Sequence, residues 1–131
     1  MSGAPPDSIA DTSAVVLLSR GDAQAERRLE GRNFAITFVT LAELRFGSLK
    51  ANDQNAAWQR VLEVLTGHSM YYTSAITSLL YADTYYDLEK RGEMIPVNDI
   101  WIAASALETG LPILARDQHF SKVRGLSVIK C

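Results

Sequence analysis

The chain has 131 residues, a formal net charge of −2 and 47% hydrophobic residues, and its sequence pI is about 5.6. A chain of this length can bury the core of one domain without a disulfide or a structural metal. The near balance of charges excludes a protein that coats nucleic acid through a broad basic surface, but it leaves open an enzyme that acts on nucleic acid.

The first residues predict a tail, then a strand and two helices. Residues 1–7 have neither the basic nor the apolar region of a signal peptide, so we expect a flexible tail over 1–7 and a single domain over 8–131. A short strand ends at Asp11, a helix follows it, and a polar surface helix covers residues 23–32.

The middle of the chain continues this alternation. Residues 34–37 are a β-prone run, and Thr40-Leu41-Ala42-Glu43 matches the capping box of a helix. Asn52 predicts the cap of a further helix. Residues 70–73 predict a third strand, and residues 74–91 predict a long helix with apolar residues on two faces. One of those faces is available to a partner.

The stretch over residues 96–120 predicts a helix that reverses into a strand. Apolar residues recur at helical spacing after Asn98, which can cap the first turn, and Gly110 can end the helix in a left-handed conformation. Residues 112–115 then resemble a buried strand. Because this helix and strand run antiparallel, Asp99 at the start of the helix and Asp117 after the strand are expected at the same edge of the sheet.

The end of the chain predicts a last short strand over residues 126–129 and closes with Cys131, the only cysteine. No intramolecular disulfide can form, and a metal site built from several cysteines is excluded. This usage suits a reducing cytoplasm. The longest apolar runs, such as residues 14–18, are far shorter than the roughly 20 residues of a membrane span. We therefore expect a soluble, cytoplasmic protein that does not contact a membrane.

Strands that alternate with helices predict an α/β fold with a mostly parallel sheet and helices on both faces. Functional sites in such folds gather beyond the carboxyl ends of the strands. Four carboxylates from four segments are expected there, namely Asp11, Glu43, Asp99 and Asp117.

Each of these carboxylates also has an ordinary structural explanation. Asp11 and Glu43 could serve as helix caps, Asp99 favours a helix N-terminus, and Asp117 could make a turn. Together, however, close carboxylates raise one another's pKa unless cations neutralise them. An all-oxygen cluster suits Mg²⁺ or Mn²⁺, and such ions support phosphodiester hydrolysis.

Three segments of the chain resemble the motifs of PIN-domain ribonucleases. They are DTSAVV at 11–16, TLAELRFG at 40–47 and NDIWIAASALETGLPILARDQHF at 98–120. Within that family the chain most resembles the VapC toxins of bacterial and archaeal toxin–antitoxin pairs, and the likeness extends from Ile9 to Ile129.

This resemblance implies a three-layer α/β/α sandwich and a Mg²⁺- or Mn²⁺-dependent endoribonuclease. It implies catalytic and metal-binding roles for Asp11, Glu43, Asp99 and Asp117, with Asp11 and Asp99 as the central ligands and Asp117 as the most variable position. Ser13 occupies the small hydroxyl position of the first motif, where it could support Asp11 or cap the helix. Structured RNA such as tRNA or ribosomal RNA, a cognate antitoxin and a second copy of the chain are the implied partners.

Other polar residues carry weaker expectations. Arg116 could touch a substrate phosphate, although an exposed arginine at a strand end explains it equally simply. His119 suggests a general base, but a metal-bound water needs none, and we expect a surface or packing residue. Arg45 and Phe46 mark the expected antitoxin contact, where an inserted arginine could pair with the carboxylates.

Two other readings of the sequence remain open. A PIN-like module without catalysis could bind RNA or a protein as a regulator, although the complete set of four acids argues against this. A phosphoacceptor receiver domain also collects aspartates at strand ends. It would need paired acids after the first strand and a nearby lysine, whereas Asp11 is followed by Thr12 and Ser13.

Overall fold

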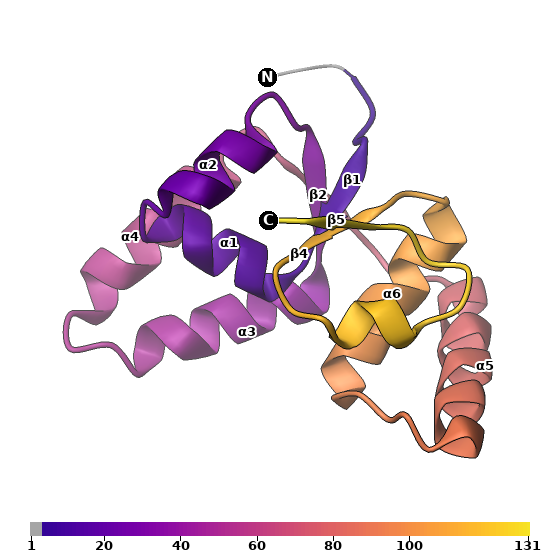
Figure 1. The fold of residues 1–131 in the computed structure, drawn as a ribbon. Coiled ribbons are helices and arrows are strands. Elements are labelled where there is room, and N and C mark those ends of the chain that lie inside the picture. The colour runs from indigo at the N-terminus through magenta and orange to yellow at the C-terminus, as the bar shows by residue number, and fades with distance from the viewer. Residues whose placement is uncertain (1–3) are drawn as a thin grey trace.

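The computed structural model describes residues 4–131, and in it five strands form one parallel sheet with helices on both faces (Figure 1). The predicted α/β fold class is confirmed, and the sheet is wholly rather than mostly parallel. The strands are β1 (Ser8–Ala10), β2 (Phe34–Thr37), β3 (Ser69–Tyr71), β4 (Ile113–Ala115) and β5 (Val128–Lys130). The helices are α1 (Thr12–Ser19), α2 (Ala23–Leu29), α3 (Phe38–Leu49), α4 (Gln54–Leu65), α5 (Ala75–Arg91), α6 (Val97–Thr109) and the 3₁₀ turn η1 (His119–Lys122).

The sheet divides the core into two apolar clusters, because successive strand residues face opposite sides. Ile9 of β1 and Ile113 of β4 pack with α5, α6 and η1, whereas Ala10 and Leu114 pack with α1, α2, α3 and α4. Figure 1 shows these two groups of helices on either side of the sheet. All four of these strand residues are fully buried, so the two central strands are fixed from both faces.

The strand order β3-β2-β1-β4-β5 places the reversal of the sheet between β1 and β4. From β1 the chain adds β2 and β3 on one side, and it then returns to add β4 and β5 on the other. Open α/β sheets bind their ligands at such a switch point, beyond the carboxyl ends of the strands. Asp11 directly follows β1, and Asp117 lies two residues beyond the end of β4. The fold therefore brings the first and last predicted carboxylates to this position.

Several helix starts differ from the sequence-based expectations. Helix α3 begins at Phe38 with Thr37 as its cap, so Thr40 and Glu43 do not form the expected capping box. Helix α4 is capped by Asp53 rather than Asn52. In each case a neighbouring side chain reaches the free N–H groups from a better position, because the helix begins one to three residues away from the predicted start.

Helix α6 also begins differently, at Val97 after Pro96, and no side chain caps it. Asn98 therefore lies in the first turn, and its amide is free to contact another element. The predicted left-handed end of this helix at Gly110 is confirmed, with a φ of 74°. Because that turn is in place, the first turn of α6 lies at the carboxyl edge of the sheet.

The expected tail is partly tied to the domain. Residues 1–3 lie outside the described part of the chain. Asp7 exchanges hydrogen bonds with Asn33, whose backbone N–H donates to the Asp7 carboxylate at 3.0 Å. The Asn33 amide also donates to the carbonyl groups of Ala4 and Pro5. Residues 4–7 thus lead into β1 along a defined path. Over residues 4–131, no helix combines the length and apolar character needed to cross a membrane.

Candidate metal centre

Asp11 is the most deeply buried carboxylate of the site, with 4% of its surface exposed. It caps α1: Oδ1 accepts the backbone N–H of Ala14 at 2.9 Å, and the Ser13 hydroxyl donates to the same carboxylate at 2.8 Å. Burial raises the pKa of Asp11 to about 6, against the two hydrogen bonds, and repulsion from Asp99 and Asp117 adds to the rise. A neighbouring cation would stabilise the ionised form of this buried carboxylate, and no lysine or arginine among the described residues pairs with it.

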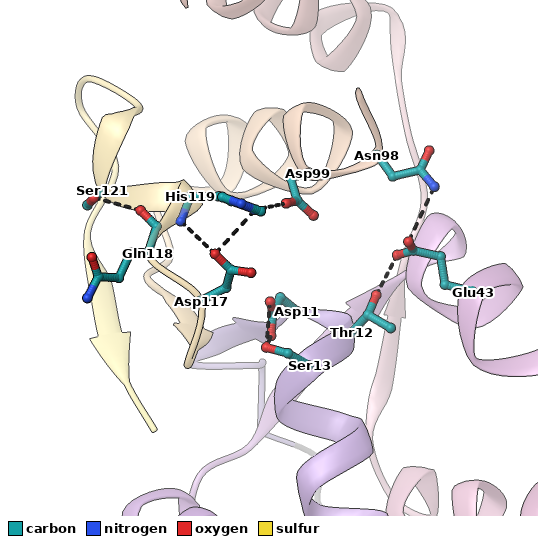
Figure 2. A network of polar contacts seen from close by, with 10 residues as sticks. All are labelled: Asp11, Thr12, Ser13, Glu43, Asn98, Asp99, Asp117, Gln118, His119 and Ser121. Atoms are coloured by element: carbon teal, nitrogen blue, oxygen red, sulfur yellow. Dashed lines mark hydrogen bonds and ion pairs between the residues drawn. The ribbon is translucent and has the colours of Figure 1, made fainter. Parts of the chain in front are cut away.

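Asp99 and Asp117 are joined by His119. The Nδ1 atom of His119 lies 2.9 Å from Oδ2 of Asp99 and 3.2 Å from Oδ1 of Asp117 (Figure 2). The backbone N–H of His119 also donates to Oδ1 of Asp117 at 2.9 Å. Burial raises the pKa of Asp99, His119 opposes that rise, and Glu43 and Asp117 reinforce it. The reversal at Gly110 therefore brings these two carboxylates together as the sequence predicts.

Glu43 belongs to a separate group on the other side of Asp11. Its Oε1 accepts the hydroxyl of Thr12 at 2.6 Å, and its Oε2 accepts the amide of Asn98 at 3.3 Å. Figure 2 shows Glu43 on α3 directed towards Thr12 and Asn98, with Asp11 and Asp99 farther along the same edge. Asn98, expected as a helix cap, thus orients a carboxylate instead.

The four carboxylates share one edge of the sheet, but they do not surround a common point. Within residues 4–131, no group of three or more histidine, cysteine, aspartate or glutamate side chains is arranged to hold a metal ion. The donor set nevertheless fits a hard divalent cation, because it offers carboxylate oxygens and includes the buried carboxylate of Asp11, which has no cationic partner in the described part of the chain. Binding an ion would require the side chains to move closer, above all Glu43.

The residues predicted at the margin of the site have other contacts. The guanidinium of Arg116 pairs with Asp22 at 2.8 Å and also donates to the carbonyl of Cys131, so in this structure it ties β4 to the C-terminal residue and to the cap of α2. Arg45 lies over the ring of Trp58. Phe46 remains 61% exposed. Arg45 and Phe46 are both exposed, so both keep the free surface that the expected antitoxin contact requires.

His119 is the residue whose importance sequence reasoning underestimated. We expected a surface or packing histidine, and the structure places its ring between two of the four acids. The available signal was its position two residues after Asp117 and directly before Phe120, which is fully buried. Gln118 and His119 both lie between Asp117 and the anchored Phe120, so this signal places His119 near the edge of the sheet but does not identify its partners.

A parallel α/β domain with carboxylates gathered at its switch point defines a class of protein that binds its ligand beyond the carboxyl ends of the strands. Residues 9–126 match the model of the PIN domain family, and the chain therefore belongs to that family. Among curated relatives, ribonuclease VapC5 of Mycobacterium tuberculosis is 30% identical over 132 aligned positions, which cover 99% of this chain and 97% of the relative.

Solved structures agree with this assignment. The VapBC-5 toxin–antitoxin structure from M. tuberculosis matches with a TM-score of 0.75 and 31% identity, covering 96% of this chain and 98% of that chain. VapBC2 from Rickettsia felis, bound to a promoter DNA fragment, matches with a TM-score of 0.86 over 93% of this chain and 96% of that chain. At 21% identity the second match shows the fold alone. Within the PIN family the chain thus stands with the VapC-type ribonucleases.

Proposed function

We propose that the chain is a metal-dependent endoribonuclease toxin that cuts structured cellular RNA in the cytoplasm and is neutralised by a cognate antitoxin. The observation that carries the proposal is the buried Asp11 at the switch point, which has no cationic partner among the described residues and has Asp99 and Asp117 close enough to raise its pKa. A named ribonuclease that is 30% identical over nearly the whole chain supports the choice of RNA as substrate.

Asp11, Asp99 and Asp117 would hold the divalent ion, with Glu43 as a further ligand directly or through water. A bound Mg²⁺ or Mn²⁺ polarises a phosphodiester and lowers the pKa of an attacking water. The chain's own part is to fix these carboxylates: Ser13 and the N-terminus of α1 orient Asp11, and Thr12 orients Glu43. Attack of water on phosphorus then leaves 5′-phosphate and 3′-hydroxyl ends.

The purified protein should cleave tRNA or ribosomal RNA when Mg²⁺ or Mn²⁺ is present, and EDTA should stop cleavage. Sequencing of the new 5′ ends identifies the RNA and the position of the cut. If neither ion binds in calorimetry and no pool of cellular RNA is cut, the chain is a non-catalytic RNA- or protein-binding module instead.

For the antitoxin we propose a groove of about 870 Å³ beside Glu43, between α3 and α6. Glu43 and Asn98 line it near the acids, and Phe46, Lys50 and Trp101 line the rest. Substituting Phe46→Ala should weaken the toxin–antitoxin complex about 10- to 100-fold, because a large exposed aromatic ring in a groove typically anchors a partner. Titration calorimetry with the co-expressed antitoxin measures the change, and unchanged affinity would place the contact elsewhere.

We also propose that α5 carries a homodimer contact. Ile76, Leu79 and Tyr86 are 58%, 66% and 65% exposed, although each is large and apolar. An exposed apolar face of this kind on a soluble domain usually marks a surface that a protein partner covers. We expect a dimer in sedimentation equilibrium at micromolar concentration and a shift towards monomer in Leu79→Glu. A monomeric wild-type protein would remove this contact.

A further inference from the structure

His119 is held on a rigid support at the edge of the sheet. It begins the turn η1, and the next residue, Phe120, is fully buried in the core beneath α6. At the other end of the turn, the guanidinium of Arg91 donates to the carbonyl of Lys122 at 2.6 Å. The backbone of η1 is thus anchored at both ends, and the contacts of the imidazole with Asp99 and Asp117 place the ring beside α6.

The imidazole links carboxylates that come from two separate elements. Its Nδ1 atom contacts Oδ2 of Asp99, in the first turn of α6, and Oδ1 of Asp117, between β4 and η1. Each contact engages one oxygen, and within residues 4–131 no hydrogen bond engages Oδ1 of Asp99 or Oδ2 of Asp117. The contacts thus leave one oxygen of each carboxylate available to a ligand (Figure 2).

We propose that His119 is a positioning residue that restrains Asp99 and Asp117 at the edge of the sheet and so favours their binding of a divalent ion. The inference rests on the proposed function, because it assumes that these carboxylates bind the ion. Nδ1 carries at most one hydrogen and lies nearer to Asp99, whereas Oδ1 of Asp117 accepts the backbone N–H of His119. A carboxylate with one oxygen fixed by a donor loses less rotational freedom when the other oxygen binds a cation. Partners of this kind typically change metal affinity about 10- to 100-fold.

The test measures Mn²⁺ binding without RNA, by calorimetry or by the paramagnetic resonance signal of free Mn²⁺. His119→Ala should weaken binding about 10- to 100-fold. His119→Asn should bind within a few-fold of wild type, because the asparagine amide places an N–H donor close to the position of Nδ1. Gln118→Ala is the matched control, since Gln118 is the exposed neighbouring residue and its side chain makes no hydrogen bond within the described chain. Thermal unfolding of all four proteins shows that each is folded.

The outcomes separate this inference from the proposed function. Unchanged or tighter Mn²⁺ binding in a folded His119→Ala protein overturns the positioning role, and lost cleavage with unchanged binding makes His119 a substrate contact. Equal weakening in the alanine and asparagine variants also overturns it, since the donor at Nδ1 would then not be the cause. If the wild-type protein binds no Mn²⁺ and cuts no RNA, the proposed function itself fails.

Discussion

Asp99→Asn is expected to reduce RNA cleavage at least about 1,000-fold, equivalent to roughly 4 kcal/mol of transition-state stabilisation. The substitution keeps the shape of the side chain but removes a negative charge that a divalent ion requires. Asp99 lies in the first turn of α6, where an asparagine is also tolerated, so the fold should persist. The measurement is the cleavage rate with saturating Mg²⁺ or Mn²⁺ on the RNA identified by end sequencing.

Glu63→Gln is the control for this substitution. Glu63 is an exposed glutamate near the end of α4 that leads into β3, at the opposite edge of the sheet from the four acids, and its replacement changes the net charge by the same amount. Cleavage by the control should equal that of wild type, and its Mn²⁺ affinity should be unchanged. Full activity in folded Asp99→Asn would contradict the assignment of the site, whereas equal losses in both variants would indicate a general effect of charge on RNA binding.

The positions of Asp11, Asp99 and Asp117 could be predicted from the sequence because each follows from a local signal with a strong physical cause. Short apolar runs predict buried strands, and the residue after such a run must leave the sheet at its carboxyl edge. Gly110 fixes the reversal of α6, since a left-handed turn favours glycine. These signals depend on only a few neighbouring residues, so they can be recognised in the sequence without knowing the tertiary structure.

The contacts of Glu43 and His119 could not be predicted in the same way. The partners of Glu43 are Thr12, 31 residues away, and Asn98, 55 residues away, whereas the local patterns of Glu43 and Asn98 suggested helix capping. His119 contacts Asp99 across 20 residues. Side-chain contacts between separate elements depend on how α1, α3 and α6 pack at the sheet edge, and no short-range pattern in one sequence encodes that packing.

In the metal-free protein, ionisation of Asp11 should lower the free energy of unfolding as the pH rises. Its pKa is raised from 3.8 to about 6 in the folded state, so between these values the folded protein binds more protons than the unfolded chain. The free energy of unfolding therefore falls as the pH rises through this window. A difference of about two pKa units corresponds to a decrease of about 3 kcal/mol in the free energy of unfolding. The decrease reaches its full size once the pH is above the folded-state pKa.

Asp11→Asn should remove this loss, because an asparagine can still accept the N–H of Ala14 and carries no charge. In EDTA, the free energy of unfolding of the variant should exceed that of wild type at pH 7.5 and approach it near pH 4, as measured by urea denaturation. Because Asp99 and Asp117 repel the Asp11 carboxylate, the difference between the two proteins contains this repulsion as well as the burial of Asp11. Adding Mn²⁺ at pH 7.5 should stabilise only the wild type, by about 2.7 kcal/mol at 100 times the dissociation constant. Parallel pH curves for the two proteins would show that the buried carboxylate does not oppose folding, and equal stabilisation by Mn²⁺ would show that Asp11 is not a ligand.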